Sequence, residues 1–229
     1  MNDINDKLAI KNEDWRNTLL LTYQYCEQKF SNVLEYSTRS LENDHGCPPP
    51  IPELNGNEGL ETDTMWNGKR VLWCYPANPK QGELLKKNEK IPVACLGTAF
   101  WAIIHTLKIL GYESKIDVDK IQTLKRVSLK HKNGLPQAFV DLGWAKEIFT
   151  DPEKTQGGDV GIIGYGEQLP HHWFIVAENP HIVTKDEKSV NTWAASPAAN
   201  GAGYDYWFKE KTNSKGESRY WKFARPFEA

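Results

Sequence analysis

The feature that most constrains the fold is an apolar stretch in the middle of the chain, which follows a proline-containing extended run at residues 91–94. Its apolar positions recur every three or four residues, which is the period of one helix face. These positions are Leu96, Ala99, Phe100, Ile103, Leu107 and Leu110. Gly111 follows directly and is a common helix-ending residue. The spacing therefore predicts a buried helix that begins near Cys95 and ends near Leu110.

Cys95 stands at the expected N-terminus of this helix. Unpaired backbone N–H groups and the positive end of the helix dipole favour a thiolate over a thiol there, so the position suits a nucleophile. Free cysteines are also common as small buried apolar residues. The position of Cys95 alone leaves both interpretations open.

Composition and charge narrow the class of protein. The 229 residues are 39% hydrophobic and 25% charged, which is typical of a globular chain with a substantial core. The formal net charge of -2 does not favour nucleic acid or an anionic membrane as a partner. No apolar run approaches the roughly 18 residues of a membrane helix, and residues 1–6 do not resemble a secretory signal. We therefore expect a protein that is made in the cytoplasm without a signal peptide and does not bind or span a membrane.

The cysteines and glycines do not indicate a metal or a cofactor. The cysteines at positions 26, 47, 74 and 95 have no zinc-ligand spacing and are expected to be free thiols, although a Cys47–Cys74 disulfide stays open. The glycines at positions 157, 158, 161, 164 and 166 lack the residues of a phosphate-binding loop. We predict no cofactor.

Helical periodicity dominates the first part of the chain, and β-branched or aromatic runs dominate the last. Helices are predicted over residues 12–41 (as one or two helices), 96–110, 116–129 and 137–143. Strands are predicted over residues 71–75, 159–164, 172–177, 189–194 and 218–224, with turns at 133–136, 178–180 and 200–203. This order predicts an α+β fold with N-terminal helices packed on an antiparallel sheet.

Two polar elements in the strand region complement the cysteine. His171 and His172 open an apolar strand, where alternation places them on opposite faces and puts His172 on the same face as Phe174 and Val176. A neutral imidazole can accept a proton from a thiol near neutral pH. Asn191 in the next strand is the best-placed residue to orient that imidazole. The alternatives for this orienting role are Asn179, Ser196 or a backbone carbonyl. The order Cys, His, Asn is that of papain-like thiol hydrolases.

Together these elements carry a family resemblance over about residues 91–196. Cys95 on a helix is followed by Gly157-Gly158-Asp159-Val160 and then by His172-Trp173-Phe174-Ile175-Val176. This pattern resembles the NlpC-type and CHAP-type cell-wall peptidases. The sequence differs from the family pattern in having Leu-Gly-Thr after the cysteine and bulky Trp173 and Phe174 after the histidine.

The resemblance implies a papain-like α+β core in which Cys95 is the nucleophile, His172 the base and Asn191 the polar third member. We expect one domain over residues 1–229, with an N-terminal helical segment and loop at 1–64 and the catalytic core at 65–229. The implied activity is hydrolysis of amide bonds in peptidoglycan stem peptides by a monomeric enzyme. Without a signal peptide, such an enzyme looks like a phage-type lysin or an antibacterial toxin. As a toxin it would be an effector carried by a dedicated machine such as type VI secretion, active in the periplasm of a target cell, with an immunity protein as partner.

Three other interpretations start from the same residues. A protein-acting or lipid-acting acyltransferase or deamidase would keep the site and change the acceptor. A non-catalytic module would bind glycan or protein through Trp193, Tyr204, Tyr206 and Trp207. A zinc enzyme built on His171, His172 and His181 is the weakest, because their spacing matches no compact ligand motif.

Overall fold

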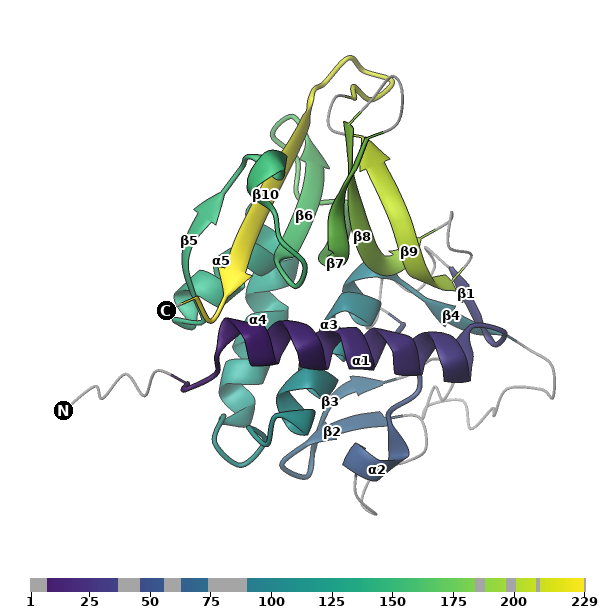
Figure 1. The fold of residues 1–229 in the computed structure, drawn as a ribbon, viewed down its shortest axis with the longest axis vertical. Helices are drawn as coiled ribbons and strands as arrows, with labels where there is room; N and C mark the ends of the chain where they lie inside the picture. The colour runs from purple at the N-terminus through teal and green to yellow at the C-terminus, as the bar shows by residue number, and fades with distance from the viewer. Residues whose placement is uncertain are drawn as a thin grey trace.

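The computed structural model describes residues 8–36, 46–55, 63–73, 90–183, 188–196, 201–208 and 211–228. Helices α1, α3, α4 and α5 lie together beside a sheet in the order β5-β10-β6-β7-β8-β9, in which all neighbouring strands are antiparallel (Figure 1). The predicted α+β class with helices on an antiparallel sheet is therefore confirmed. None of the described helices is long and apolar enough to cross a membrane.

The elements have the following bounds. The helices are α1 (Asn12–Phe30), α2 (Pro52–Asn55), α3 (Cys95–Ile109), α4 (Val118–Lys130), α5 (Gly134–Asp141) and a 3-10 turn, η2 (Pro152–Lys154). The strands of the large sheet are β5 (Ala145–Phe149), β6 (Val160–Tyr165), β7 (His172–Val183), β8 (Lys188–Ser196), β9 (Gly201–Phe208) and β10 (Arg219–Pro226). Two small pairs complete the fold: β1 (Leu34–Tyr36) with β4 (Ile91–Val93), and β2 (Asp63–Trp66) with β3 (Lys69–Trp73).

Helix α3 is the centre of the fold, as the sequence predicted. Every residue from Cys95 to Lys108 is buried, because α3 packs against α1, β7 and β8. The helix ends where expected, since Gly111 adopts a left-handed φ of 75° and its N–H donates to the Lys108 carbonyl at 2.8 Å. A helix buried on all sides holds the position of its first residue, Cys95, against the sheet.

The sheet buries side chains on both faces. On the helix-covered face, the Trp173 indole donates to the Ser128 carbonyl of α4 at 2.9 Å, and Trp193 stacks on Tyr23 of α1 with ring centroids 4.3 Å apart. The other face carries a second aromatic cluster, whose members His172, Phe174, Trp207, Trp221 and Phe223 are linked by ring contacts. His172 and Phe174 therefore share a face, as alternation predicted.

Four predicted boundaries were wrong. The first helix ends at Phe30 and is followed by β1, which pairs in parallel with β4, while residues 37–41 lie outside the described part. Helix α5 begins at Gly134 inside the predicted turn. Residues 178–180 lie within β7, where the pairing with β8 shifts register, rather than in a turn that ends the strand. Strands β2, β5 and β9 were not predicted, and β9 occupies the region of the expected turn at residues 200–203.

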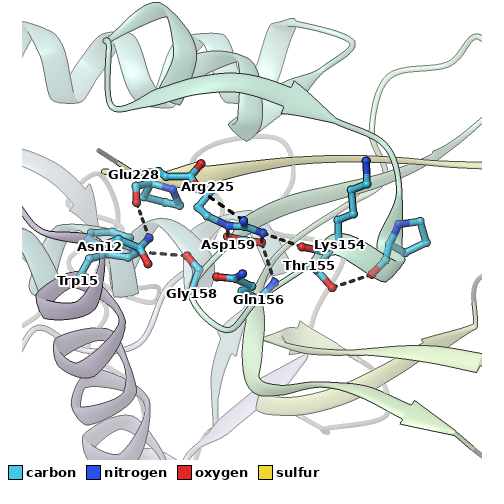
Figure 2. Close-up of polar contacts among 11 residues, drawn as sticks. Asn12, Trp15, Lys154, Thr155, Gln156, Gly158, Asp159, Arg225 and Glu228 are labelled. Carbon is cyan, nitrogen blue, oxygen red and sulfur yellow. Dashed lines mark hydrogen bonds and ion pairs between the residues drawn. The ribbon is translucent and has the colours of Figure 1, made fainter.

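The start of α1 is joined to the end of β10. The Asn12 side-chain amide donates to the Pro226 carbonyl at 2.6 Å, and the Trp15 indole donates to the Gly158 carbonyl at 3.0 Å (Figure 2). The ring of Trp15 also packs edge-on against Phe227, with centroids 5.2 Å apart. These contacts fasten the N-terminal helix to the C-terminal strand.

Candidate active site

Cys95 is the first residue of α3, and its thiol faces backbone N–H groups. The N-cap residue Ala94 has no side chain that can accept a hydrogen bond, so the first N–H groups of the helix need another partner. The backbone N–H groups of Trp173, Leu96 and Cys95 are near enough to the Cys95 sulfur to lower the pKa of the thiol. A negative charge at this position would therefore be stabilised by three donors and by the helix dipole.

Burial opposes that stabilisation. Cys95 is 3% exposed, and burial raises the pKa of its thiol, while the three N–H groups act in the opposite direction. Tyr36 of β1 lies close enough for the Cys95 charge to contribute to a raised pKa of the tyrosine, after burial. The resting cysteine is therefore a neutral thiol in a site built to receive negative charge.

His172 is the first residue of β7 and is also 3% exposed. Burial and, to a smaller extent, the neighbouring positive charges of His171 and Arg219 together lower the pKa of His172 to about 3. The Nε2 atom is buried, and within the described part of the chain it has no hydrogen-bond partner. The imidazole is therefore neutral, which is the protonation state that a general base requires.

The structure brings Cys95 to the strand that His172 opens. The contact runs through the backbone, because the N–H that faces the Cys95 sulfur belongs to Trp173, the residue directly after His172. Among the described residues no hydrogen bond joins the Cys95 thiol to the His172 ring. Alternation along β7 puts Trp173 on the helix-covered face and His172 on the other, so the structure does not bring the thiol and the imidazole together.

The structure does not bring Asn191 to His172. Pairing of β7 with β8 aligns Val176 with Thr192, so Asn191 faces the shifted part of β7, roughly 16 Å along the strand from His172. Counting from the Ile175–Trp193 pair places Ser196 across from His172 instead, and Ser196 is fully buried. The side chain of Asn179 lies outside the described part of the structure.

Asp159, from the Gly-Asp part of the family pattern, belongs to a structural ion pair. Its carboxylate accepts hydrogen bonds from Arg225 Nε at 3.0 Å, from a second Arg225 nitrogen at 3.1 Å and from the Gln156 backbone N–H at 2.8 Å (Figure 2). Burial raises the pKa of Asp159, and the bonds from Arg225 and Gln156 offset part of that rise. Asp159 therefore ties the start of β6 to the end of β10.

Sequence reasoning assigned Trp207 of β9 only to the alternative binding module and assigned no role to Arg219 of β10. The Trp207 ring lies against His172, with centroids 4.5 Å apart, and the Arg219 guanidinium carbon lies 5.2 Å from the centroid of Trp207. Both residues come from strands far from His172 in the sequence. No local pattern could have connected them to it.

The structure also bears on the binding-module and zinc-site interpretations and on the open disulfide. Trp193 is fully buried against Tyr23, so it is a core residue rather than a ligand contact, and the side chain of Tyr206 lies outside the described part. Among the described residues no group of three or more His, Cys, Asp or Glu side chains is placed to hold a metal ion. Cys47, one half of the disulfide left open, is buried, and Cys74 lies outside the described residues.

Two buried neutral histidines predict acid sensitivity. Burial lowers the pKa of His105, in α3, to about 3, as it does for His172, whereas an unfolded histidine titrates near 6.5. Between these values the unfolded chain binds protons that the folded protein does not, so the free energy of unfolding should fall as the pH drops below about 6.5. Each histidine should contribute about 1.4 kcal/mol per pH unit in this window.

Denaturant unfolding between pH 7 and 5 measures the slope of the unfolding free energy against pH. His172→Gln should reduce that slope by the contribution of about one proton. An unchanged slope in that variant would contradict the buried neutral state.

Comparison of the chain with protein-family models, with curated proteins and with solved structures found no match.

Proposed function

We propose that this protein is a cysteine hydrolase that cleaves amide bonds in peptidoglycan stem peptides. The observation that carries the proposal is the placement of the Cys95 thiol at the start of α3, facing three backbone N–H groups, one of which follows His172 directly. The site supplies a nucleophile with donors for negative charge, and the neutral imidazole belongs to the residue before Trp173 on the same strand, so the proposed reaction requires the start of β7 to turn that imidazole toward the thiol. A papain-like core, with the helix-borne cysteine against the histidine strand, belongs to the same proposal.

The chemistry follows from these groups. His172 takes the proton of Cys95 as the sulfur attacks the substrate carbonyl carbon, and the carbonyl oxygen becomes an oxyanion that backbone N–H groups at the start of α3 stabilise. The protonated His172 then gives its proton to the leaving amine as the C–N bond breaks. Water, deprotonated by His172, hydrolyses the thioester and restores the free thiol. Because Cys95 and His172 are both about 3% exposed, substrate must displace side chains that cover them.

The biological setting is part of the proposal and rests on the family resemblance. It comprises export by a dedicated machine such as type VI secretion, or release as a phage-type lysin. In the first case the enzyme acts in the periplasm of a target cell and has an immunity protein as partner.

Digestion of purified peptidoglycan sacculi, followed by mass analysis of the fragments, tests this function. We expect soluble fragments that each differ from the intact stem by one hydrolysed amide bond. His172→Ala should lower the rate by about 1000-fold, because general-base catalysis is typically worth 10²–10⁴. His171→Ala should cost much less, because that ring is exposed and stacks on Tyr165.

The same experiment separates the alternatives. Equal losses from the two histidine variants would contradict the assignment of His172 as base. Fragments that carry a new acyl acceptor in place of water would identify a transferase. Binding to sacculi without any cleavage would identify a non-catalytic module.

A further inference from the structure

The imidazole of His172 packs against two aromatic rings. Its centroid lies 4.5 Å from that of Trp207, at an interplanar angle of 30°, and 5.7 Å from that of Phe174, at 26°. These distances are in the range of favourable ring pairs. Phe174 lies two residues further along the same strand, so Trp207 is the contact that comes from outside β7.

The hydrogen-bonding state of the His172 and Trp207 rings also favours orientation of the imidazole by packing. His172 Nε2 and Trp207 Nε1 are both buried, and within the described part of the chain neither has a hydrogen-bond partner. Asn191, the predicted orienting residue, lies in the part of β8 that faces the shifted segment of β7. Packing on the faces of the imidazole therefore contributes to holding its orientation.

We propose that Trp207 is a positioning residue that fixes the orientation of the His172 imidazole by stacking, in the role that the sequence assigned to Asn191. This inference rests on the proposed function of His172 as base. Trp207 reaches His172 from β9, where it pairs with Val190 of β8, so the sheet itself holds the indole in place.

The charged and titratable groups around His172 come from four elements. On the face that His172 shares with Trp207 they are His171 before β7, Tyr165 at the end of β6 and Arg219 at the start of β10, and Cys95 of α3 is near the backbone of Trp173 on the other face. Arg219 donates to the Tyr165 hydroxyl at 2.9 Å and lies over the rings of Tyr165 and Trp207. Removing the Trp207 ring would therefore admit water to the imidazole without adding or removing a charge nearby.

The test compares Trp207→Phe, which keeps an aromatic face, with Trp207→Ala and Trp207→Leu, which do not. Trp207→Leu retains apolar volume and keeps the test usable if the alanine variant does not fold. On sacculus-derived peptides we expect kcat to fall about 100-fold in the alanine and leucine variants, with KM within about twofold, because small misplacements of a catalytic group cost rates of this order. Trp207→Phe should restore kcat to within about fivefold of the wild type.

A second measurement reports on the ring directly and does not need activity. Histidine NMR titration should show the pKa of His172 rising from its buried value toward 6.5 in Trp207→Ala and Trp207→Leu, and staying low in Trp207→Phe. An unchanged titration and kcat in the alanine and leucine variants, or a phenylalanine variant as impaired as they are, would overturn the proposal. If Cys95→Ala kept full activity, the proposed function would fail, while the titration would still decide whether Trp207 holds the ring.

Discussion

Replacing Cys95 with alanine should lower kcat on peptidoglycan peptides by about 10⁴-fold or more, to the background rate. The thiol forms the covalent intermediate, and removing a nucleophile leaves only the residual effect of binding and oxyanion stabilisation. The change removes one buried atom and adds none, so it should destabilise the fold by only about 1 kcal/mol. Product release by mass analysis and urea unfolding measure the two effects.

Cys26→Ala is the matched control for this variant. Cys26 is likewise a buried free thiol, but it lies in α1. Burial, with a smaller contribution from Glu27, raises the pKa of its thiol well above the usual value. The Cys26 variant should therefore keep wild-type kcat at a similar cost in stability. Full activity of Cys95→Ala would refute the thiol mechanism, and loss of folded structure in that variant alone would identify Cys95 as a core residue.

Breaking the pair between Asp159 and Arg225 should give the largest loss of stability. Asp159→Ala leaves the Arg225 guanidinium, whose side chain is 18% exposed, without its bidentate partner. Removing one partner of a buried ion pair typically costs about 3 kcal/mol, which corresponds to a fall in Tm of roughly 10 °C for a chain of this size. Urea unfolding and thermal melts would measure the change.

Two comparisons show whether this loss comes from the pair. The double variant Asp159→Ala/Arg225→Ala should lose less stability than the sum of the two single variants, because each single change already breaks the same bonds. The exposed pair of Lys132 and Glu167 provides the contrast, and Glu167→Ala should leave the unfolding curve unchanged. If the stability losses of the two single variants add up in the double variant, Asp159 and Arg225 do not stabilise the fold through one another.

The parts of the fold that the sequence predicted are those in which periodicity and burial agree. Helix α3 is buried on every side, and the central strands β6 and β7 carry continuous apolar runs. The strands of the large sheet that were missed, β5 and β9, are its two edges, and β1 and β2 of the small pairs were also missed. An edge strand is paired on one side only, so its sequence need not be strongly apolar. Glycines at positions 201 and 203 made β9 look like a turn, although both residues pair with β8.

Only the parts of the candidate site that follow from local sequence patterns were predicted. Cys95 and the start of β7 follow from a helix start and a strand start, and the structure places them together. The contact between His172 and Asn191 was expected from their order in the chain. Between Val176 and His181 the ladder shifts, so the distance between residues on β7 and β8 does not follow from counting along the sequence. Trp207 could not be assigned for the same reason, since its contact with His172 depends on the whole curvature of the sheet.

The junction between α1 and β10 also determines how the protein responds to a pulling force. Asn12 and Trp15 near one end of the chain hold Pro226, Phe227 and the Gly158 carbonyl near the other (Figure 2). A force that pulls residue 12 away from residue 227 therefore acts directly on this small group of contacts. Once these contacts break, α1 is no longer fixed to β10, and the face of α3 that α1 covers is exposed.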